Sequence, residues 1–243
     1  MNKNLYEKYH SSTKKQVKII SENNFTYINI IPILNSCLNG GVKNILDIGC
    51  GSGTISLHLA SKGFKVKGID ISKKAIKACE ESSKSIGLKN VEFEVSDFPN
   101  KILNGKYDLV FFSEVIEHLP DDEFALKKIH KLLNPGGILF LSTPSKNAPM
   151  HKLGLAKKFD KEVGHLRRYT IEELREKLKR NGFKVKNIYK KESILRNFLF
   201  LNPFAGKFIR FIRFFLVDVV TSVDNTLVNV FGESQIIITA QKI

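Results

Sequence analysis

The sequence has no long apolar run, and it holds few cysteines and comparatively few acids. A membrane-spanning helix needs about 20 consecutive, largely apolar residues, so no segment of this chain is expected to cross a bilayer. The three cysteines, Cys37, Cys50 and Cys79, lack the spacing of a metal site, and their odd number fits reduced thiols in a cytoplasmic protein. The polar first residues are not expected to form a signal peptide.

The sequence has fewer acidic than basic residues. It contains 24 Asp and Glu and 39 Lys and Arg, which gives a net charge of +15. Such an excess is typical of proteins that bind nucleic acid or an anionic membrane surface. It is unevenly spread, because residues 41–150 hold 15 lysines against 13 acids, whereas residues 151–243 hold 19 basic residues against nine acids. The basic surface is therefore expected to be separate from the central segment, which carries the motifs.

Short apolar segments alternate with helix-like segments through the middle of the chain, and this alternation predicts a parallel sheet covered by helices on both faces. Two later strands, at 183–189 and 235–241, are expected to finish the sheet as an antiparallel pair. The expected α/β fold is a Rossmann-like, doubly wound, seven-stranded and mostly parallel sheet with a helical C-terminal insertion over 194–231. The other strands are predicted at 44–48, 65–69, 91–95, 107–112 and 138–142, and the helices at 54–61, 72–84, 121–133 and 170–181.

Three glycines at alternate positions, Gly49, Gly51 and Gly53, follow the first predicted strand, and Asp47 lies two residues before them. Glycine lets the backbone turn sharply and approach a ligand, and the helix that follows offers free N–H groups. A dinucleotide site has the spacing G-x-G-x-x-G, whereas this loop has G-x-G-x-G. The preceding acid suits a ligand with an ammonium group better than it suits a pyrophosphate.

Acids also stand where the next two predicted strands end. Asp70 ends the second strand, where a carboxylate can accept hydrogen bonds from both hydroxyls of a ribose. Asp97 and Phe98 follow the third strand, where an acid can bind an adenine amine and an aromatic ring can pack on the base. Each acid alone could be a turn or capping residue, but together they predict a nucleoside site at the carboxyl edge of the sheet.

Four segments carry a resemblance to a known family: Leu-Asp-Ile-Gly-Cys-Gly-Ser-Gly, Gly-Ile-Asp-Ile-Ser, Ser-Asp-Phe and Leu-Asn-Pro-Gly-Gly-Ile-Leu. In order and spacing they resemble the motifs of class I S-adenosylmethionine-dependent methyltransferases over roughly residues 40–190. The resemblance implies S-adenosylmethionine as methyl donor, with its methionine end at the glycine loop. The residues that it assigns to the cofactor are Asp47, Gly49, Gly51, Gly53, Asp70, Ile71, Asp97, Phe98 and Ser113.

The same resemblance implies a domain organisation. Residues 1–40 would form a helical lid over the cofactor, and residues 41–243 the S-adenosylmethionine-dependent methyltransferase domain, with the insertion at 194–231 before its last strand. Tyr6, Tyr9 and His10 would close the lid. The alternative is a frayed tail, which fits Tyr6 better than the other two.

The residues after the fourth predicted strand narrow the subclass. No Asn/Asp-Pro-Pro-Tyr motif follows it, which argues against methylation of exocyclic amines. The segment Glu-Val-Ile-Glu-His-Leu-Pro is instead similar to that of the ubiquinone-biosynthesis O-methyltransferases, in the methyltransferase type 11 and 12 group. That resemblance implies a divalent cation such as Mg²⁺ held by Glu114, Glu117 and His118. The alternatives are that His118 is a base beside the cofactor, or that the acids are solvated and the histidine is structural.

Methyl transfer to a hydroxyl group requires removal of the hydroxyl proton, so a general base is expected. The candidate catalytic bases are His118 and His165. The segment 160–169 precedes a predicted helix and is expected to roof the acceptor pocket, although its His165 and Arg167 could instead bind backbone carbonyls of an ordered loop. The residues predicted to line the substrate pocket are Tyr9, His10, His151, Arg167 and Tyr169.

The insertion contains a predicted amphipathic helix over 204–220. At about 100° per residue, Lys207, Arg210, Arg213 and Asp218 fall on one arc, and phenylalanines and aliphatic residues fall on the opposite face. Such a helix can lie in a membrane interface, cover the substrate pocket, pair two copies in a homodimer, or pack on the enzyme's own core. Nucleic acid fits less well, because the basic residues alternate with large apolar side chains.

Together these features predict O-methylation of a small-molecule, sugar or lipid-like acceptor, in the cytoplasm or at the inner membrane surface. Two alternatives remain open. One is an RNA methyltransferase that uses the basic C-terminal surface, and the other is a module that binds S-adenosylmethionine without catalysis.

Overall fold

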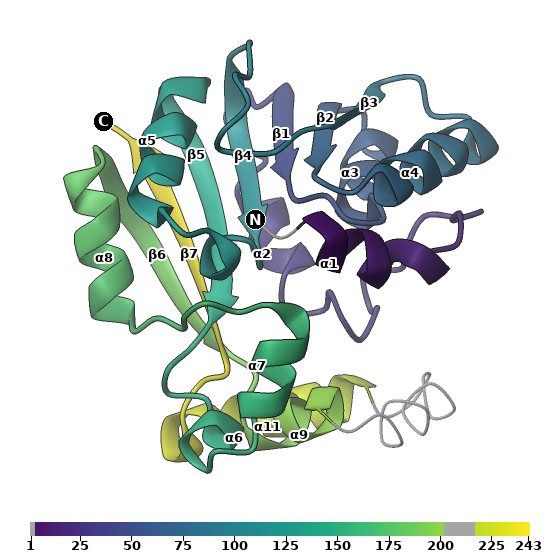
Figure 1. The fold of residues 1–243 in the computed structure, drawn as a ribbon. Helices are drawn as coiled ribbons and strands as arrows, with labels where there is room; N and C mark the ends of the chain where they lie inside the picture. The colour runs from purple at the N-terminus through teal and green to yellow at the C-terminus, as the bar shows by residue number, and fades with distance from the viewer. Residues whose placement is uncertain (1–2, 202–216) are drawn as a thin grey trace.

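The structure, a computed structural model, describes residues 3–201 and 217–243, and their strands form one seven-stranded sheet (Figure 1). The strand order is β3-β2-β1-β4-β5-β7-β6. Strands β1 to β5 pair in parallel, whereas β7 is antiparallel to both β5 and β6. The predicted Rossmann-like, mostly parallel sheet is therefore confirmed. The strands are β1 (Asn44–Ile48), β2 (Lys65–Asp70), β3 (Val91–Val95), β4 (Tyr107–Ser113), β5 (Leu133–Pro144), β6 (Phe183–Lys191) and β7 (Gln235–Lys242).

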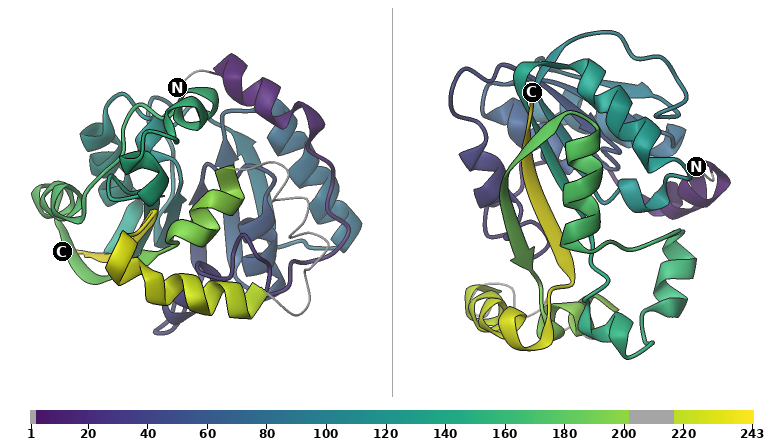
Figure 2. Two further views of the ribbon diagram at one scale, coloured as in Figure 1. Left: turned by 90° about the horizontal axis from the view of Figure 1, so that it is seen from below. Right: turned by 90° about the vertical axis from the view of Figure 1, so that its left-hand side faces the viewer.

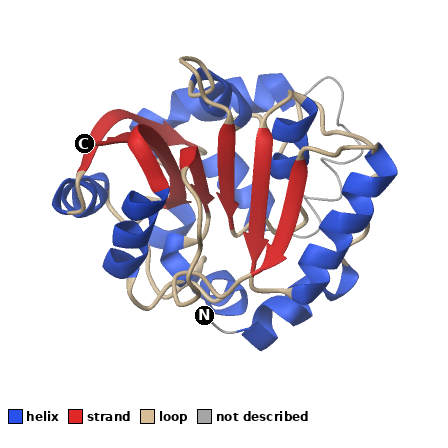
Figure 3. Cartoon of the chain, turned by 90° about the horizontal axis from the view of Figure 1, so that it is seen from above, coloured by secondary structure: helices blue, strands red, loops and turns tan. Residues whose placement is uncertain are grey.

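Helices cover both faces of the sheet (Figure 3). Leu34 of α2 and Leu59 of α3 belong to one buried cluster, and Leu126 of α5 and Leu174 of α8 belong to the other. Successive strand residues point to opposite faces, so Phe140 joins the first cluster and its neighbours in β5 join the second. The described helices are α1 (Lys3–Tyr9), α2 (Ile31–Ser36), α3 (Thr54–Ser61), α4 (Lys73–Ile86), α5 (Asp122–Leu132), α6 (Pro149–Lys152), α7 (Lys157–Val163), α8 (Ile171–Arg180), α9 (Ile194–Leu201) and α11 (Val217–Phe231), with 3₁₀ turns η1 (His10–Ser12) and η2 (Ile116–His118).

Most element boundaries follow the sequence signals. Thr170 caps α8 in a reciprocal pair of hydrogen bonds with Glu173, as the spacing of the two residues predicts. Strand β5 is the exception, because it begins at Leu133 and not at residue 138. Leu133 pairs with Tyr107, and a register shift between Tyr107 and Leu109 accommodates the Asn-Pro-Gly-Gly segment within the strand.

The strand order reverses between β1 and β4, which makes the carboxyl edge of these strands the expected ligand crevice. Helix α1 and the group α6, α7, α9 and α11 all lie at that end of the sheet (Figures 1 and 2). The N-terminal segment and the insertion therefore meet the sheet where its strands end.

Within the insertion, the structure describes helices α9 and α11. Most of the predicted amphipathic helix over 204–220, including Lys207, Arg210 and Arg213, lies outside the described residues. Helix α11 buries Val217, Thr221, Asp224 and Val228, so its buried face carries both apolar and polar side chains. None of the helices on the described residues is long and apolar enough to span a bilayer.

Candidate active site

A cavity of about 670 Å³ opens between α1, α7 and the carboxyl edge of the sheet. This volume lies in the range of small-molecule and cofactor sites, about 300–1,000 Å³. Its wall joins residues of the glycine loop, the ends of β2 and β4, and the start of β7. The predicted site residues that line it are Tyr9, His10, Asp47, Gly49, Gly51, Asp70, Ile71, Phe98, Ser113, Glu114, His118 and His165.

Asp47 lies near the end of β1 and is almost fully buried. Its Oδ2 accepts a hydrogen bond of 2.5 Å from Ser56 Oγ. Burial raises the pKa of Asp47 to about 7, with the hydrogen bond from Ser56 lowering it and the nearby carboxylate of Asp70 contributing to the rise. A buried acid in this position has much to gain from a cationic ligand.

Asp70 ends β2 and ties the glycine loop to it. Its Oδ2 accepts from the backbone N–H of Gly51 at 3.0 Å, and its Oδ1 accepts from the N–H of Ser72 at 2.9 Å. These bonds fix the carboxylate at the cavity wall beside Ile71.

The loop glycines serve two purposes. Gly49, Gly51 and Gly53 all have positive φ, between 53° and 76°, which glycine adopts without strain. A side chain on Gly49 would collide with Val115, so this glycine allows close approach of the chain to the cavity. Gly53 does not line the cavity, and a Cβ there would lie 2.8 Å from Cys79 Sγ, so Gly53 lets α3 pack against α4.

The segment after β3 places Phe98 but not Asp97 in the cavity wall. Phe98 is buried, whereas Asp97 is exposed and accepts a hydrogen bond from Asn100 Nδ2 at 3.1 Å. The sequence did not single out Ser96, which lines the cavity with a buried Oγ that has no hydrogen-bond partner among the described residues.

Helix α1 covers the cavity and is anchored to α4. Glu7 accepts hydrogen bonds from Ser72 Oγ at 3.0 Å and from the N–H of Lys73 at 2.8 Å. Tyr6 lines the cavity and packs edge-on against His118, with ring centroids 5.6 Å apart. Because Tyr6 lies within helix α1 and packs against His118, the structure does not show it as part of a frayed tail.

The other two predicted lid residues lie toward the glycine loop. His10 approaches Gly51, and its Nδ1 lies 3.2 Å from Thr13 Oγ1. Tyr9 packs edge-on against His10 and is 66% exposed at the rim. Both therefore border the cofactor end of the cavity rather than a separate acceptor pocket.

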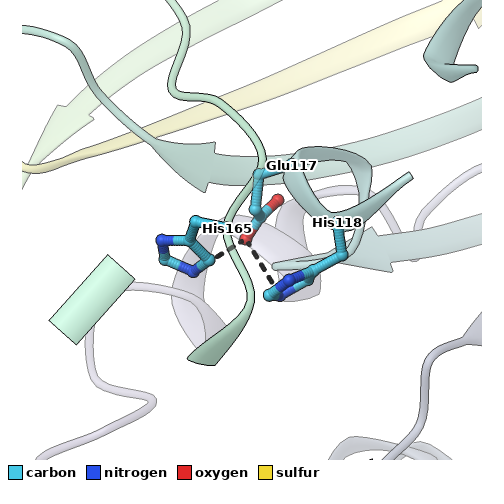
Figure 4. Close-up of side chains that lie close together, drawn as sticks. All are labelled: Glu117, His118 and His165. Atoms are coloured by element: carbon cyan, nitrogen blue, oxygen red, sulfur yellow. Dashed lines mark ion pairs between the residues drawn. The ribbon is translucent and has the colours of Figure 1, made fainter. Parts of the chain in front are cut away.

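Glu117, His118 and His165 converge beside the cavity (Figure 4). Glu117 is fully buried, and its Oε1 lies 3.8 Å from His118 Nε2 and 3.9 Å from His165 Nε2. Its Oε2 accepts from Thr143 Oγ1, whereas Oε1 has no hydrogen-bond partner among the described residues. Burial raises the pKa of Glu117 well above its ordinary value, and Glu114 adds to this shift.

Both imidazoles are held by their Nδ1 atoms. His118 Nδ1 lies 3.0 Å from the carbonyl oxygen of Gly164, which can only accept, so Nδ1 carries the proton and the lone pair lies on Nε2. Burial lowers the pKa of His118 to about 4 and keeps this ring neutral. His165 Nδ1 lies 2.8 Å from Asp160 Oδ1, which places its Nε2 toward Glu117.

Asp160 is itself held in a charged network. Arg168 donates to it through Nε at 2.9 Å and through Nη2 at 2.6 Å. Burial opposes ionisation, but the hydrogen bonds from His165 and Arg168 prevail and lower the pKa of Asp160 below its ordinary value. The ionised carboxylate therefore orients His165 and can stabilise its protonated form.

The three residues that can offer ligand atoms to one cation differ from those predicted. Within the described part of the chain, the ligand atoms of Glu117, His118 and His165 lie within 4.8 Å of one another. Glu114 turns away, and its Oε1 accepts from Ser142 Oγ at 2.7 Å. The predicted inclusion of Glu114 is therefore wrong, because the backbone after β4 bends at this residue, which has φ of 55°.

Three residues predicted in the substrate pocket do not line the cavity. Arg167 pairs with Asp122 at 3.1 Å, and buried Tyr169 donates to the same carboxylate at 2.7 Å. His151 Nδ1 lies 3.7 Å from Asp160, behind His165. These side chains support the wall of the cavity from outside.

The structure adds a polar end to the cavity, formed by Glu114, Glu192, Ser234 and Gln235. Of these, the sequence singled out only Glu114. Gln235 begins a predicted strand and Glu192 follows another, but nothing local marks either residue as facing a ligand.

Comparison with known proteins identifies a family and a set of relatives. A methyltransferase domain family matches residues 24–188. The ubiquinone biosynthesis O-methyltransferase of Chromobacterium violaceum is 34% identical over 119 residues, which are 46% of this chain and 49% of that protein. The protein of the same name from Pseudomonas aeruginosa is 33% identical over 111 residues, 43% of this chain and 46% of the relative. The chain thus matches about half the length of these curated relatives.

Solved structures share the fold. An S-adenosylmethionine-dependent methyltransferase from Methanosarcina mazei is 25% identical, with a TM-score of 0.60 over 87% of this chain and 97% of that one. The N-methyltransferase NodS from Bradyrhizobium japonicum, in complex with S-adenosylhomocysteine, is 17% identical, with a TM-score of 0.64 over 100% of this chain and 99% of that one. The second likeness concerns the fold alone.

Proposed function

The chain belongs to the methyltransferase domain family and is an S-adenosylmethionine-dependent methyltransferase, and we propose that it methylates an oxygen of a small-molecule, sugar or lipid-like acceptor. The observation that carries this proposal is His165, whose Nδ1 is held by ionised Asp160 and whose Nε2 faces Glu117. A base of this kind is needed for a hydroxyl acceptor. Relatives named O-methyltransferases match a little under half of the chain and support the same reaction.

The cofactor fits the end of the cavity next to the glycine loop. Asp47 would pair with the ammonium group of S-adenosylmethionine, and Asp70 would accept hydrogen bonds from the ribose hydroxyls. Ile71 and Phe98 supply apolar surface for the adenine, and Ser96 Oγ offers it a hydrogen bond. The methyl group that the cofactor supplies would have to reach the side of the cavity that holds the two histidines.

In the proposed mechanism, the acceptor hydroxyl lies between the methyl group and His165. Its proton moves to His165 Nε2 as the new O–CH₃ bond forms and the S–CH₃ bond breaks, leaving S-adenosylhomocysteine. Asp160 stabilises the resulting imidazolium, and neutral His118 accepts a hydrogen bond from the acceptor through Nε2. Alignment of the acceptor hydroxyl with the methyl group, and exclusion of water by α1, supply the rest of the rate acceleration.

Product analysis tests the proposal. The purified protein is incubated with S-adenosylmethionine carrying a labelled methyl group and with hydroxylated compounds, matched amines, or a tRNA transcript. We expect the label in an alkali-stable ether of a hydroxylated compound. Label in an amine or in the transcript would overturn O-methylation of a small acceptor, and transfer to the transcript would depend steeply on salt concentration.

As an alternative to base catalysis by His165, we propose that Glu117, His118 and His165 hold a divalent cation, in which case His165 Nε2 would bind the ion and would not accept the proton. The residues fit such an ion, because Glu117 Oε1 is buried without a partner and both Nε2 atoms carry lone pairs toward it. Two imidazoles and one carboxylate suit a first-row transition metal better than Mg²⁺. The ion would act as a Lewis acid that lowers the pKa of the acceptor hydroxyl.

Binding of Mn²⁺ alone, followed by electron paramagnetic resonance, tests the cation site without an activity assay. We expect stoichiometric binding that is lost in Glu117→Gln and kept in Glu114→Gln, since Glu114 points elsewhere. Equal binding in Glu117→Gln and wild type would refute the site.

We further propose that α11 rests on an anionic lipid surface. The helix exposes Val219, Val223 and Val230 on its outer face, while Val217, Thr221, Asp224 and Val228 are buried. Near its end, beside Gly232, lies the ammonium group of Lys152, which complements a negative surface. These exposed apolar side chains favour insertion at the level of lipid headgroups.

Co-sedimentation with vesicles of phosphatidylcholine and phosphatidylglycerol tests this contact. We expect wild type to sediment and the Val223→Glu/Val230→Glu variant to remain in solution. Ile102→Glu is the control, because Ile102 is equally exposed but lies in the loop between β3 and β4. Loss of a dimer in the double variant, with vesicle binding unchanged, would contradict the lipid proposal.

A further inference from the structure

The polar end of the cavity contains both of the non-glycine residues with positive φ in the described part of the chain. They are Glu114, with φ of 55°, and Glu192, with φ of 59°. Side chains with a Cβ adopt this conformation at an energetic cost, and a glycine would relieve it. Both glutamates stand directly after strands, β4 and β6, and both line the same cavity.

Strand register brings the two glutamates to Gln235. Gln235 begins β7 and pairs with Pro144 of β5 and Lys191 of β6, so Glu192 follows its neighbour in the sheet. On the other side, Gln235 Nε2 donates to Glu114 Oε1 at 3.1 Å. The glutamine amide therefore joins segments that lie far apart in the sequence.

Two buried polar atoms at this end have no partner. Gln235 is 9% exposed and Ser234 is 6% exposed, and both line the cavity. Neither Gln235 Oε1 nor Ser234 Oγ has a hydrogen-bond partner among the described residues. An unpaired buried polar atom is unfavourable, so these atoms point to a ligand that supplies the missing hydrogen bonds.

The polar end consists mainly of hydrogen-bond acceptors. An amide oxygen and two carboxylates can only accept, while a serine hydroxyl can do either. Arg196 fixes the carboxylate of Glu192 through a contact of 2.9 Å, so this acceptor is held in place before a ligand binds. A matching ligand must present several O–H or N–H donors together.

We propose that Glu114, Glu192, Ser234 and Gln235 bind the hydroxyl groups of a sugar-like, polyhydroxylated acceptor and present a further hydroxyl to His165. This assignment rests on the proposed O-methylation and names its substrate class. A ring of hydroxyl groups can satisfy the acceptors of the polar end together. An apolar phenol has too few donors and would leave buried acceptors unpaired, which a site of this kind discriminates against strongly.

Binding and turnover are measured separately with the same probes. The probes are methyl glycosides of glucose, galactose, mannose and rhamnose, with glucosamine as the amine and 3,4-dihydroxybenzoate as the phenol. Saturation-transfer NMR on protein loaded with S-adenosylhomocysteine reports binding, and formation of S-adenosylhomocysteine from S-adenosylmethionine reports turnover. Each is repeated for Gln235→Met, for Ser234→Ala and for the matched control Gln241→Met.

Gln241 lies on the same strand but donates to Gly136 outside the cavity, so its replacement tests the general effect of losing a glutamine from β7. We expect at least one glycoside to bind, and Gln235→Met to weaken that binding by tenfold or more, mainly through KM. We expect Ser234→Ala to weaken it by a smaller factor and Gln241→Met to leave it unchanged.

Three results would overturn the assignment: no glycoside binds, the phenol or the amine is the preferred ligand, or Gln235→Met binds glycosides as wild type does. Failure of O-methylation itself gives a different result. In that case glycosides bind in a Gln235-dependent manner, but no hydroxylated probe accepts a methyl group.

Discussion

The two ends of the cavity differ in which residues adopt a backbone conformation with positive φ. At the cofactor end, the residues with positive φ are glycines such as Gly49 and Gly51, which adopt that conformation without strain. At the polar end, they are Glu114 and Glu192, for which it is unfavourable. At the cofactor end, glycines allow a ligand to approach the backbone closely. At the polar end, an unfavourable backbone conformation places two carboxylates in the cavity wall.

Hydrogen bonding differs in the same way. Asp47 and Asp70 are already paired with Ser56 and with backbone N–H groups. By contrast, Gln235 Oε1 and Glu117 Oε1 are buried without partners. Apart from Ser96 Oγ, the acceptors of the cofactor end are paired within the protein, whereas those of the acceptor side await a ligand, and specificity for one acceptor would reside there.

The largest expected effect is on the acceptor side. His165→Gln should lower kcat by about 10²- to 10⁴-fold, because it removes the proposed base, while the affinity for S-adenosylmethionine stays within twofold of wild type. Stopped assays of methyl transfer and calorimetry measure the two quantities. His130→Gln is the control, since His130 packs against Phe183 away from the cavity. Equal kcat in His165→Gln and wild type would remove the base from the mechanism.

A change at the cofactor end should act on binding instead. Asp70→Ala should weaken binding of S-adenosylmethionine by about 100-fold, because it removes hydrogen bonds to a charged group and releases the glycine loop. Calorimetry checks this, with exposed Glu80→Ala as the control. Unchanged affinity would mean that the cofactor does not lie against β2.

The buried acid at the cofactor end predicts a pH dependence. Burial raises the pKa of Asp47 from 3.8 to about 7, with Asp70 as its charged neighbour. Below this pKa the acid is protonated and cannot pair with the ammonium group, so affinity should fall by up to about tenfold per pH unit below pH 7. Calorimetry between pH 5.5 and 8 measures how the affinity for S-adenosylmethionine depends on pH. In Asp47→Asn the slope should disappear.

The raised pKa of Asp47 also predicts how the stability of the ligand-free protein depends on pH. Because the folded pKa of Asp47 lies above its unfolded value, the folded state binds more protons between about pH 4 and pH 7, and its free energy of unfolding should decrease as pH rises through that window. Asp47→Asn should flatten this dependence in urea titrations. A slope in Asp47→Asn equal to that of wild type would assign it to another group.

The smallest expected effect tests the backbone contrast directly. Glu114→Gly should have a free energy of unfolding about 1 kcal/mol higher than that of Glu114→Ala, because both variants lose the carboxylate that accepts from Ser142 and Gln235 and only glycine relieves the unfavourable φ. Gly49→Ala should lower the free energy of unfolding by about 1–3 kcal/mol, because its methyl group would collide with Val115. Thermal unfolding measures these differences, and equal stability of Glu114→Gly and Glu114→Ala would show that Glu114 is not strained.

The sequence predicted the cofactor end well, for a physical reason. Asp47, Gly49 and Gly51 lie within one short segment, and Asp70 ends the next strand, so local spacing and the parallel sheet suffice to bring them together. The error at Asp97 and Phe98 came from treating neighbours as equivalent, because only one of two successive residues faces the cavity.

The acceptor side was harder because it depends on contacts between distant segments. His165 reaches Glu117 only because the loop before α8 binds back onto η2, with the N–H of Leu166 donating to Glu117 O at 3.0 Å. Likewise Gln235 meets Glu114 through the register of β7, which no local pattern encodes. The resemblance grouped Glu114 with Glu117 and His118, but the backbone bend at Glu114 directs its carboxylate to Ser142 instead.

The anchoring of α1 has a consequence for the timing of turnover. Glu7 accepts hydrogen bonds from Lys73 and Ser72 at the start of α4, so the helix that covers the cavity also caps the helix that follows β2. Withdrawing α1 leaves those groups of α4 without their partner. Exchange of one cofactor molecule for the next would therefore require these hydrogen bonds to break, so the contact between Glu7 and α4 contributes to the barrier for cofactor exchange.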